Sequence, residues 1–155
     1  IILLLSLPIP TETLIKQLSS RNIFNKKFIG IASYSPKSFE KLMQERGLTF
    51  IHLQAAPDAA NSTLEIVKEY RSDCVNKGKP LNKASLEFYM ATSIFIDILN
   101  KIDGEITKEK IIEQVENIKD YDFKGLKLNF NPQTRCIRNN FWINEGNNNV
   151  IEYPI

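Results

Sequence analysis

The sequence predicts an α/β fold in which a parallel sheet is flanked by helices and antiparallel strands follow at the end of the chain. In the first half of the chain, short apolar runs rich in β-branched and aromatic residues alternate with amphipathic helical segments. In the tail, apolar residues alternate with polar ones between turn residues, which is typical of antiparallel strands. The 155 residues are 43% hydrophobic and 25% charged, a globular composition.

The chain opens on an apolar run, residues 1–7, that ends at Pro8. The run lacks the positive region and the cleavage site of a signal peptide, and it is too short to span a bilayer. It therefore predicts a strand buried on both faces, as in a parallel sheet. Because a protein does not normally begin in the middle of a sheet, we expect upstream residues to be missing.

Capping residues and apolar periodicity predict five helices. The first spans 11–21 with Thr11 as its N-cap, and the second begins at Ser35–Pro36 and ends at Gly47. The third begins with the capping-box pattern of residues 62–65.

The fourth predicted helix, 83–102, is apolar around so much of its circumference that we expect it to pack on more than one side. The fifth begins at Thr107 and is expected to bury four residues: Ile111, Ile112, Val115 and Ile118.

Strands are predicted between and after these helices. Two internal ones span 28–32 and 48–53. The tail contributes 126–130, 137–143 and 150–153. The segment Gln54–Ala60 has small residues and one proline, and two interpretations stay open: a surface loop, or a strand that crosses between two lobes.

The residue inventory points away from common catalytic classes. No HExxH, GxSxG, phosphate-loop or GxGxxG pattern occurs, so we expect no enzyme, no cofactor and no metal. The net charge of +2 gives no reason to expect nucleic acid. His52 lies in an apolar strand and is expected to be packed, as is Cys74 on a helix face. Cys74 and Cys136 permit one disulfide without requiring it.

Three segments taken in order resemble a known family: residues 3–18, residues 28–35, and Pro80 with 84–91. They are similar to the C-terminal portion of the type I periplasmic-binding fold, specifically the branched-chain amino-acid (Leu/Ile/Val) receptors of ABC importers. Residues 123–132 resemble a late segment of the same family. The resemblance implies two lobes, in which residues 1–56 and 122–155 belong to one and residues 57–121 to the other. Gln54–Ala60 would then be a crossover.

The resemblance also implies a function. The chain would be part of the solute-binding component of an ABC importer. By hinge closure it would bind a small amino-acid-like or other small polar or amphiphilic molecule between two lobes, and it would deliver this molecule to a membrane permease. It would work in the periplasm or outside the cytoplasm on a lipid anchor, after a signal peptide, together with its missing N-terminal part. The ligand residues implied are those that follow two strands: Ser6, Leu7, Pro8, Ile9, Thr11, Ala32, Ser33 and Tyr34.

One departure from the family concerns charge. Members that bind amino acids place a carboxylate in the second loop, whereas no acid lies between Gly30 and Phe39 here. We therefore expect a small polar or amphiphilic ligand that lacks an ammonium group, or a charge partner in the missing lobe. The alternatives are a ligand-sensing receptor domain of the same fold and a Rossmann-like enzyme fragment. The absent glycine fingerprint argues against the enzyme.

Overall fold

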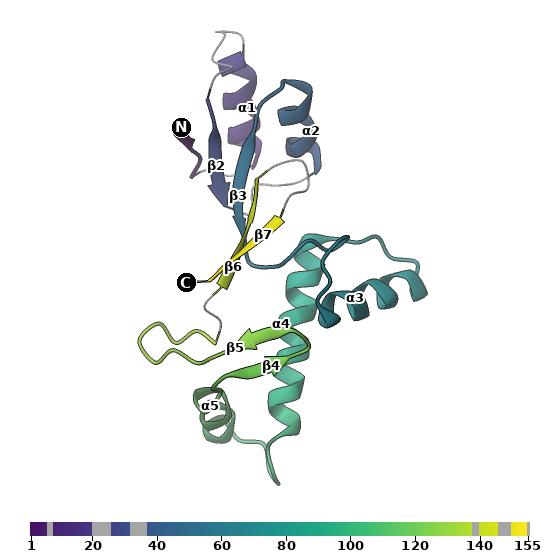
Figure 1. The fold of residues 1–155 in the computed structure, drawn as a ribbon, viewed down its shortest axis with the longest axis vertical. Helices are drawn as coiled ribbons and strands as arrows, with labels where there is room; N and C mark the ends of the chain where they lie inside the picture. The colour runs from purple at the N-terminus through teal and green to yellow at the C-terminus, as the bar shows by residue number, and fades with distance from the viewer. Residues whose placement is uncertain (6–7, 20–25, 32–36, 138–139, 146–149, 155) are drawn as a thin grey trace. The chain divides into compact units, whose positions relative to one another are not determined.

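The computed structural model describes residues 1–5, 8–19, 26–31, 37–137, 140–145 and 150–154 (Figure 1). The chain forms two compact units. Unit 1 comprises 1–55 and 141–153, and unit 2 comprises 56–140 with the last two residues. The chain therefore leaves unit 1 at Ala55 and returns to it at Phe141, not near residue 122 as the sequence suggested.

Unit 1 contains a sheet with the strand order β1-β2-β3-β6-β7. The bounds of its strands are β1 Ile2–Leu3, β2 Phe28–Ile31, β3 Phe50–Gln54, β6 Asn140–Asn144 and β7 Val150–Pro154. The first three strands are parallel, with Leu3 beside Ile29 and Ile29 beside Ile51. Strand β6 then joins β3 in the antiparallel sense. The predicted α/β class, a parallel sheet with antiparallel terminal strands, is confirmed.

Helices α1 (Pro8–Ser19) and α2 (Lys37–Glu45) pack on one face of this sheet (Figure 1). The core between them is built from side chains that alternate along the strands and face the helices. Its buried members are Leu4, Ile15, Phe28, Phe39, Met43 and Phe50.

The N-terminal run is not buried on both faces, so that prediction was wrong. Leu4 is 3% exposed, whereas its neighbours Leu3 and Leu5 are 61% and 73% exposed. The physical reason is that α1 and α2 cover only the face toward which Leu4 points. Among the described residues of unit 1, no helix covers the opposite face of the sheet.

Two helix ends in unit 1 test the predicted caps. Helix α1 begins at Pro8, three residues before the predicted cap, and Thr11 is buried within its first turn. A proline is well suited to a first helical turn because the N–H that it lacks has no intrahelical partner there. Helix α2 is followed by Gly47 with φ of +61°, and Leu48 N donates to Met43 O at 2.9 Å. The predicted glycine terminator is thus confirmed.

Unit 2 is built from three helices and one hairpin. The elements are α3 Glu65–Asn76, α4 Lys83–Asn100, α5 Lys108–Glu116, β4 Tyr121–Phe123 and β5 Leu126–Leu128. Both α3 and α5 pack against α4. The core comprises one face of α3, one face of α4 and alternate strand residues: Ile66, Val67, Tyr70, Cys74, Leu86, Met90, Ile94, Ile98, Phe123, Leu126 and Leu128.

The start of α3 differs from its predicted capping box. The N-cap is Leu64, which makes no side-chain capping bond, and Ser62 Oγ instead accepts from Leu64 N at 3.4 Å. The Ile66 N–H donates to Lys124 O at 3.3 Å, so a backbone carbonyl far along the chain satisfies it. By contrast, Thr107 caps α5 as predicted, accepting from Lys110 N at 3.3 Å.

The hairpin β4–β5 explains why residues 122–140 lie in unit 2. Lys124 and Gly125 have φ of +52° and +89°, which gives a two-residue turn with both central residues left-handed. The turn contacts α3 through Lys124 O, and Phe130 N donates to Ile118 O at 2.8 Å. Helix α5 buries none of its residues and Ile112 is 37% exposed, so its predicted buried face was also wrong.

Hydroxyl groups tie α3 to α4. Tyr89 Oη donates to Asp73 Oδ2 at 3.0 Å, and Tyr70 Oη donates to Asn82 O at 3.0 Å. Burial of the phenol, followed by its bond to Asp73, raises the pKa of Tyr89 to about 12. Cys74 is buried as predicted, and both it and Cys136 are free thiols.

Candidate ligand-binding site

The candidate site is the edge of unit 1 where the parallel strands end. In an α/β sheet the carboxyl ends of the strands meet the N-termini of the following helices, and small molecules bind there. Here β1 leads to α1, β2 leads to α2, and β3 ends beside them at Gln54. Of the predicted ligand residues, Pro8, Ile9 and Thr11 lie at the start of α1. Ser6, Leu7, Ala32, Ser33 and Tyr34 fall outside the described residues.

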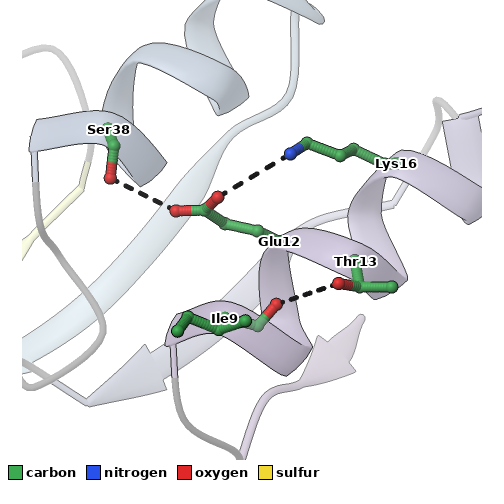
Figure 2. Close-up of polar contacts among 5 residues, drawn as sticks. All are labelled: Ile9, Glu12, Thr13, Lys16 and Ser38. Carbon is green, nitrogen blue, oxygen red and sulfur yellow. Dashed lines mark hydrogen bonds and ion pairs between the residues drawn. The ribbon is translucent and has the colours of Figure 1, made fainter.

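Ile9 and Thr11 have opposite environments. The side chain of Ile9 is 79% exposed, whereas Thr11 is 1% exposed. Thr13 Oγ1 donates back to Ile9 O at 3.1 Å, which fixes the first turn around Ile9 (Figure 2). Ile9 therefore offers apolar surface at this edge, and Thr11 packs inside the protein.

The first turn of α1 is poor in hydrogen-bond donors. Pro8 and Pro10 have no N–H, so two of the first four helical positions cannot donate a backbone hydrogen bond. Helix N-termini bind anions through these groups together with the helix dipole. This turn is therefore suited to a weakly charged group more than to a multiply charged anion.

Glu12 joins the two helices that begin at this edge, as Figure 2 shows. Its Oε1 accepts from Ser38 Oγ, in the first turn of α2, at 3.2 Å, and its Oε2 lies 3.8 Å from Lys16 Nζ. The Glu12 carboxylate thus holds the starts of α1 and α2 together. Glu12 was not among the site residues predicted from the sequence. Its spacing of four from Lys16 was the available signal, but the contact with Ser38 is tertiary.

The end of β3 carries two buried polar side chains. His52 and Gln54 are 2% and 3% exposed, and the His52 ring stacks on Phe50 with centroids 5.2 Å apart. Gln54 is paired in register with Trp142 of β6, which is also buried. The packing of His52 confirms its prediction from the sequence. Within the described ranges, no group of three residues is arranged to hold a metal ion.

Gly30 allows the sheet to pack at this edge. A Cβ atom at Gly30 would lie 2.8 Å from Phe50 Cζ. The Phe50 ring cannot easily move, because it packs edge-on against Phe39 at 4.9 Å and stacks on His52. Glycine is therefore needed at residue 30 because a side chain there would not fit. Its backbone does not have the positive φ that would by itself require glycine.

We expect Gly30→Ala to lower the free energy of unfolding of unit 1 by about 1–2 kcal/mol. Overpacking against Phe50 costs roughly 1–3 kcal/mol, which exceeds the gain of about 0.4–1 kcal/mol from a less flexible unfolded chain. Urea denaturation followed by fluorescence measures the change. The double variant Gly30→Ala/Phe50→Leu should recover part of the loss, because it opens the space that the new methyl group needs. A stabilised Gly30→Ala variant would show that the contact is not tight.

Comparisons with known proteins identify the fold and leave the activity open. No protein-family model matches the chain, and no curated protein sequence matches it. Solved structures do match. A possible leucine/isoleucine/valine-binding protein from Rhodopirellula baltica aligns with 97% of this chain and 42% of its own, at 22% identity and a TM-score of 0.78.

Two further structures lead to the same fold. The leucine-binding protein LivK of Thermotoga maritima aligns with 93% of this chain and 41% of its own, at 16% identity and a TM-score of 0.65. The branched-chain amino acid transporter substrate-binding protein LivJ of Streptococcus pneumoniae, in complex with isoleucine, covers 97% and 42% at 11% identity, with a TM-score of 0.64.

These likenesses confirm that the chain has part of the type I periplasmic-binding fold. The chain spans about two fifths of the length of the structures it matches. In the part of the chain that the structure describes, no helix has the length and apolarity needed to span a membrane.

Proposed function

We propose that this chain is part of the solute-binding component of an ABC importer, located outside the cytoplasm. In this proposal the edge of unit 1 at the start of α1 and α2 supplies one wall of the ligand site, and a second lobe closes over the ligand by hinge motion. A membrane permease receives the ligand. The observation that carries the proposal is an exposed apolar residue, Ile9, at the carboxyl edge of a parallel sheet in a fold shared with solute-binding proteins.

The chemistry of the edge favours a small amphiphilic ligand. Ile9 supplies apolar contact, and the donor-poor first turn of α1 suits a single carboxylate better than a multiply charged anion. Glu12 is already bound to Ser38 and Lys16, so its charge is largely committed within the protein. We therefore propose a branched aliphatic acid, with or without an amino group, as the ligand class.

Isothermal titration calorimetry on the protein as its gene encodes it tests this proposal. The panel pairs leucine, isoleucine and valine with their 2-oxo acids, which have the same side chains but no ammonium group. Binding of either series supports the proposal. Tighter binding of the 2-oxo acids would show that no ammonium partner exists, and tighter binding of the amino acids would place that partner outside residues 30–39. Failure of both series to bind would contradict the proposed ligand class.

Substitution of Ile9 tests the wall directly. We expect Ile9→Ser to raise the Kd of the bound ligand by about 10- to 100-fold, because burying an isoleucine side chain is worth roughly 1.5–3 kcal/mol. Leu14→Ser is the matched control, since Leu14 lies on the same helix, is 40% exposed and is more than one turn further from the edge. Equal affinities of Ile9→Ser and the unaltered protein would exclude Ile9 from the site.

A further inference from the structure

Arg71 of α3 holds the stretch of chain that follows the passage from unit 1 to unit 2. The chain leaves unit 1 at Ala55, and residues 58–62 form a turn soon afterwards. Arg71 Nη1 donates to three backbone carbonyl oxygens of this 58–62 turn: Ser62 O at 2.9 Å, Ala60 O at 3.0 Å and Ala59 O at 3.4 Å. These bonds fix the turn to α3.

Asp58 shapes the same turn from within. Its Oδ1 accepts from Ala60 N at 2.8 Å, and its Oδ2 accepts from Asn61 Nδ2 at 2.7 Å. Ser62 N closes the turn by donating to Asp58 O at 3.1 Å. An aspartate that accepts from the backbone two residues further on stabilises a turn. The 58–62 turn therefore has a defined shape of its own, and Arg71 joins that shape to the helix.

The hydrogen bonds of Arg71 indicate that it serves to hold this turn. A guanidinium presents its donors in a rigid planar fork, which is well suited to a carboxylate or a phosphate. Among the residues that the structure describes, Arg71 forms no ion pair, and its hydrogen bonds all go to carbonyls of the 58–62 turn. Carbonyl oxygens carry no net charge, so these bonds provide a fixed backbone position.

The backbone before the turn is held as well. Gln54, the last residue of β3, pairs with Trp142 of β6 in unit 1. Only residues 55–57 lie between this pairing and the 58–62 turn. Pro57 has a fixed φ and restricts the backbone of the residue before it. Bending at this passage must therefore use a few backbone torsions of three residues.

We propose that Arg71 is a positioning residue for hinge closure: by fixing the 58–62 turn to α3, it confines the bending of this passage to residues 55–57. The inference rests on the proposed function, in which two lobes close over a ligand. A passage that bends at few torsions allows fewer open arrangements in the protein without ligand, so closing costs less conformational entropy. The apparent affinity for the ligand rises with the population of the binding-competent arrangement.

Distances between spin labels in the complete gene product test the confinement without any ligand. Labels at Lys41→Cys in unit 1 and Glu113→Cys in unit 2 occupy exposed positions, and Cys136→Ser removes the exposed native thiol. We expect Arg71→Met, which keeps an apolar stem and removes the guanidinium, to broaden the distribution of label distances. Lys68→Met is the matched control, because it removes an exposed positive charge from the same helix.

Calorimetry with leucine and its 2-oxo acid measures the effect on binding. For whichever of the two binds the unaltered protein, we expect Arg71→Met to raise the Kd about 3- to 10-fold, while the label distances at saturation stay unchanged. A residue that only stabilised unit 2 would lower the melting temperature and leave the width of the ligand-free distribution unchanged. Arg71→Lys keeps the charge and can donate to carbonyl oxygens, so it should restore part of the affinity.

The inference and the proposed function can fail separately. Asp58→Ala loosens the turn from within and leaves α3 unaltered, so it should broaden the same distribution even if Arg71→Met does not fold. Distributions and Kd values of Arg71→Met and Asp58→Ala equal to those of Lys68→Met would overturn the inference. If neither compound binds the unaltered protein, the proposed ligand class is wrong, whereas the ligand-free distances still decide whether Arg71 confines the passage.

Discussion

Phe39→Ala is expected to lower the free energy of unfolding of unit 1 by about 3–5 kcal/mol, the usual cost of removing a buried phenylalanine. Phe39 is 0% exposed and packs edge-on against Phe50, so it joins α2 to the middle of the sheet. The chain has a single tryptophan, Trp142, which is buried in the same unit. Urea denaturation followed by Trp142 fluorescence therefore reports on unit 1.

Lys41→Ala is the control on the same helix. Lys41 Nζ and Glu45 Oε1 form an exposed ion pair at 3.7 Å. Removing this pair is expected to lower the free energy of unfolding by about 0.5 kcal/mol or less. Under the proposed function, Phe39→Ala should also weaken ligand binding, because it loosens α2, whose Ser38 contacts Glu12. A Phe39→Ala variant as stable as Lys41→Ala would show that the core between α2 and the sheet is not as described.

Leu126→Ala is expected to destabilise unit 2 by about 2–5 kcal/mol. Leu126 and Leu128 are each 1% exposed and point from one face of β5 into the core, two residues apart. Helices α3 and α4 belong to this unit, so far-UV circular dichroism reports on its unfolding. The Trp142 signal, which reports on unit 1, should shift less than the dichroism signal.

Lys127→Ala separates the packing of β5 from its surface charge. Lys127 lies between the two leucines on the opposite face, exposed and 2.6 Å from Asp122 Oδ2. Exposed ion pairs contribute about 0–1 kcal/mol, so this variant should be close to the unaltered protein in stability. If Lys127→Ala lowered the free energy of unfolding as much as Leu126→Ala, the ion pair and not the buried leucines would stabilise the hairpin.

The parallel part of the sheet could be predicted because its signals are local. Each strand of unit 1 is a short apolar run, and the α2 terminator and the α5 cap depend only on Gly47 and Thr107. These features need no knowledge of residues distant in the sequence. The class of the fold follows from their order along the chain.

The elements that were missed depend on distant contacts. Strand β4 was not predicted, because Asp120 and Asp122 surround Tyr121 and the Lys124–Gly125 turn lacks the asparagine that usually marks such hairpins. The capping box predicted for α3 does not form, and here too a contact with a distant residue is the reason. Lys124 O, in that same turn, accepts the Ile66 N–H.

The candidate site was predicted in outline only. The chain order and the family resemblance indicated residues 6–11 as part of the site, but the helix was expected to begin at Thr11 and begins at Pro8. That Thr11 is buried while Ile9 is exposed depends on how α1 lies on the sheet, which periodicity does not determine. The bond from Ser38 to Glu12 joins two helices separated by a strand, so no pattern within either helix indicates it.

The position of β6 in the sheet has a consequence for how the protein forms. Residues 52 and 144 are neighbours in the pairing of β3 with β6, although residues 56–140 of unit 2 lie between them in the chain. Closing so long a loop costs entropy before any contact repays it, and folding slows as such non-local pairs increase. A ribosome must have released Trp142 before unit 1 can complete its sheet. The sheet of unit 1 is therefore completed late, after the helices and the hairpin of unit 2 have been made.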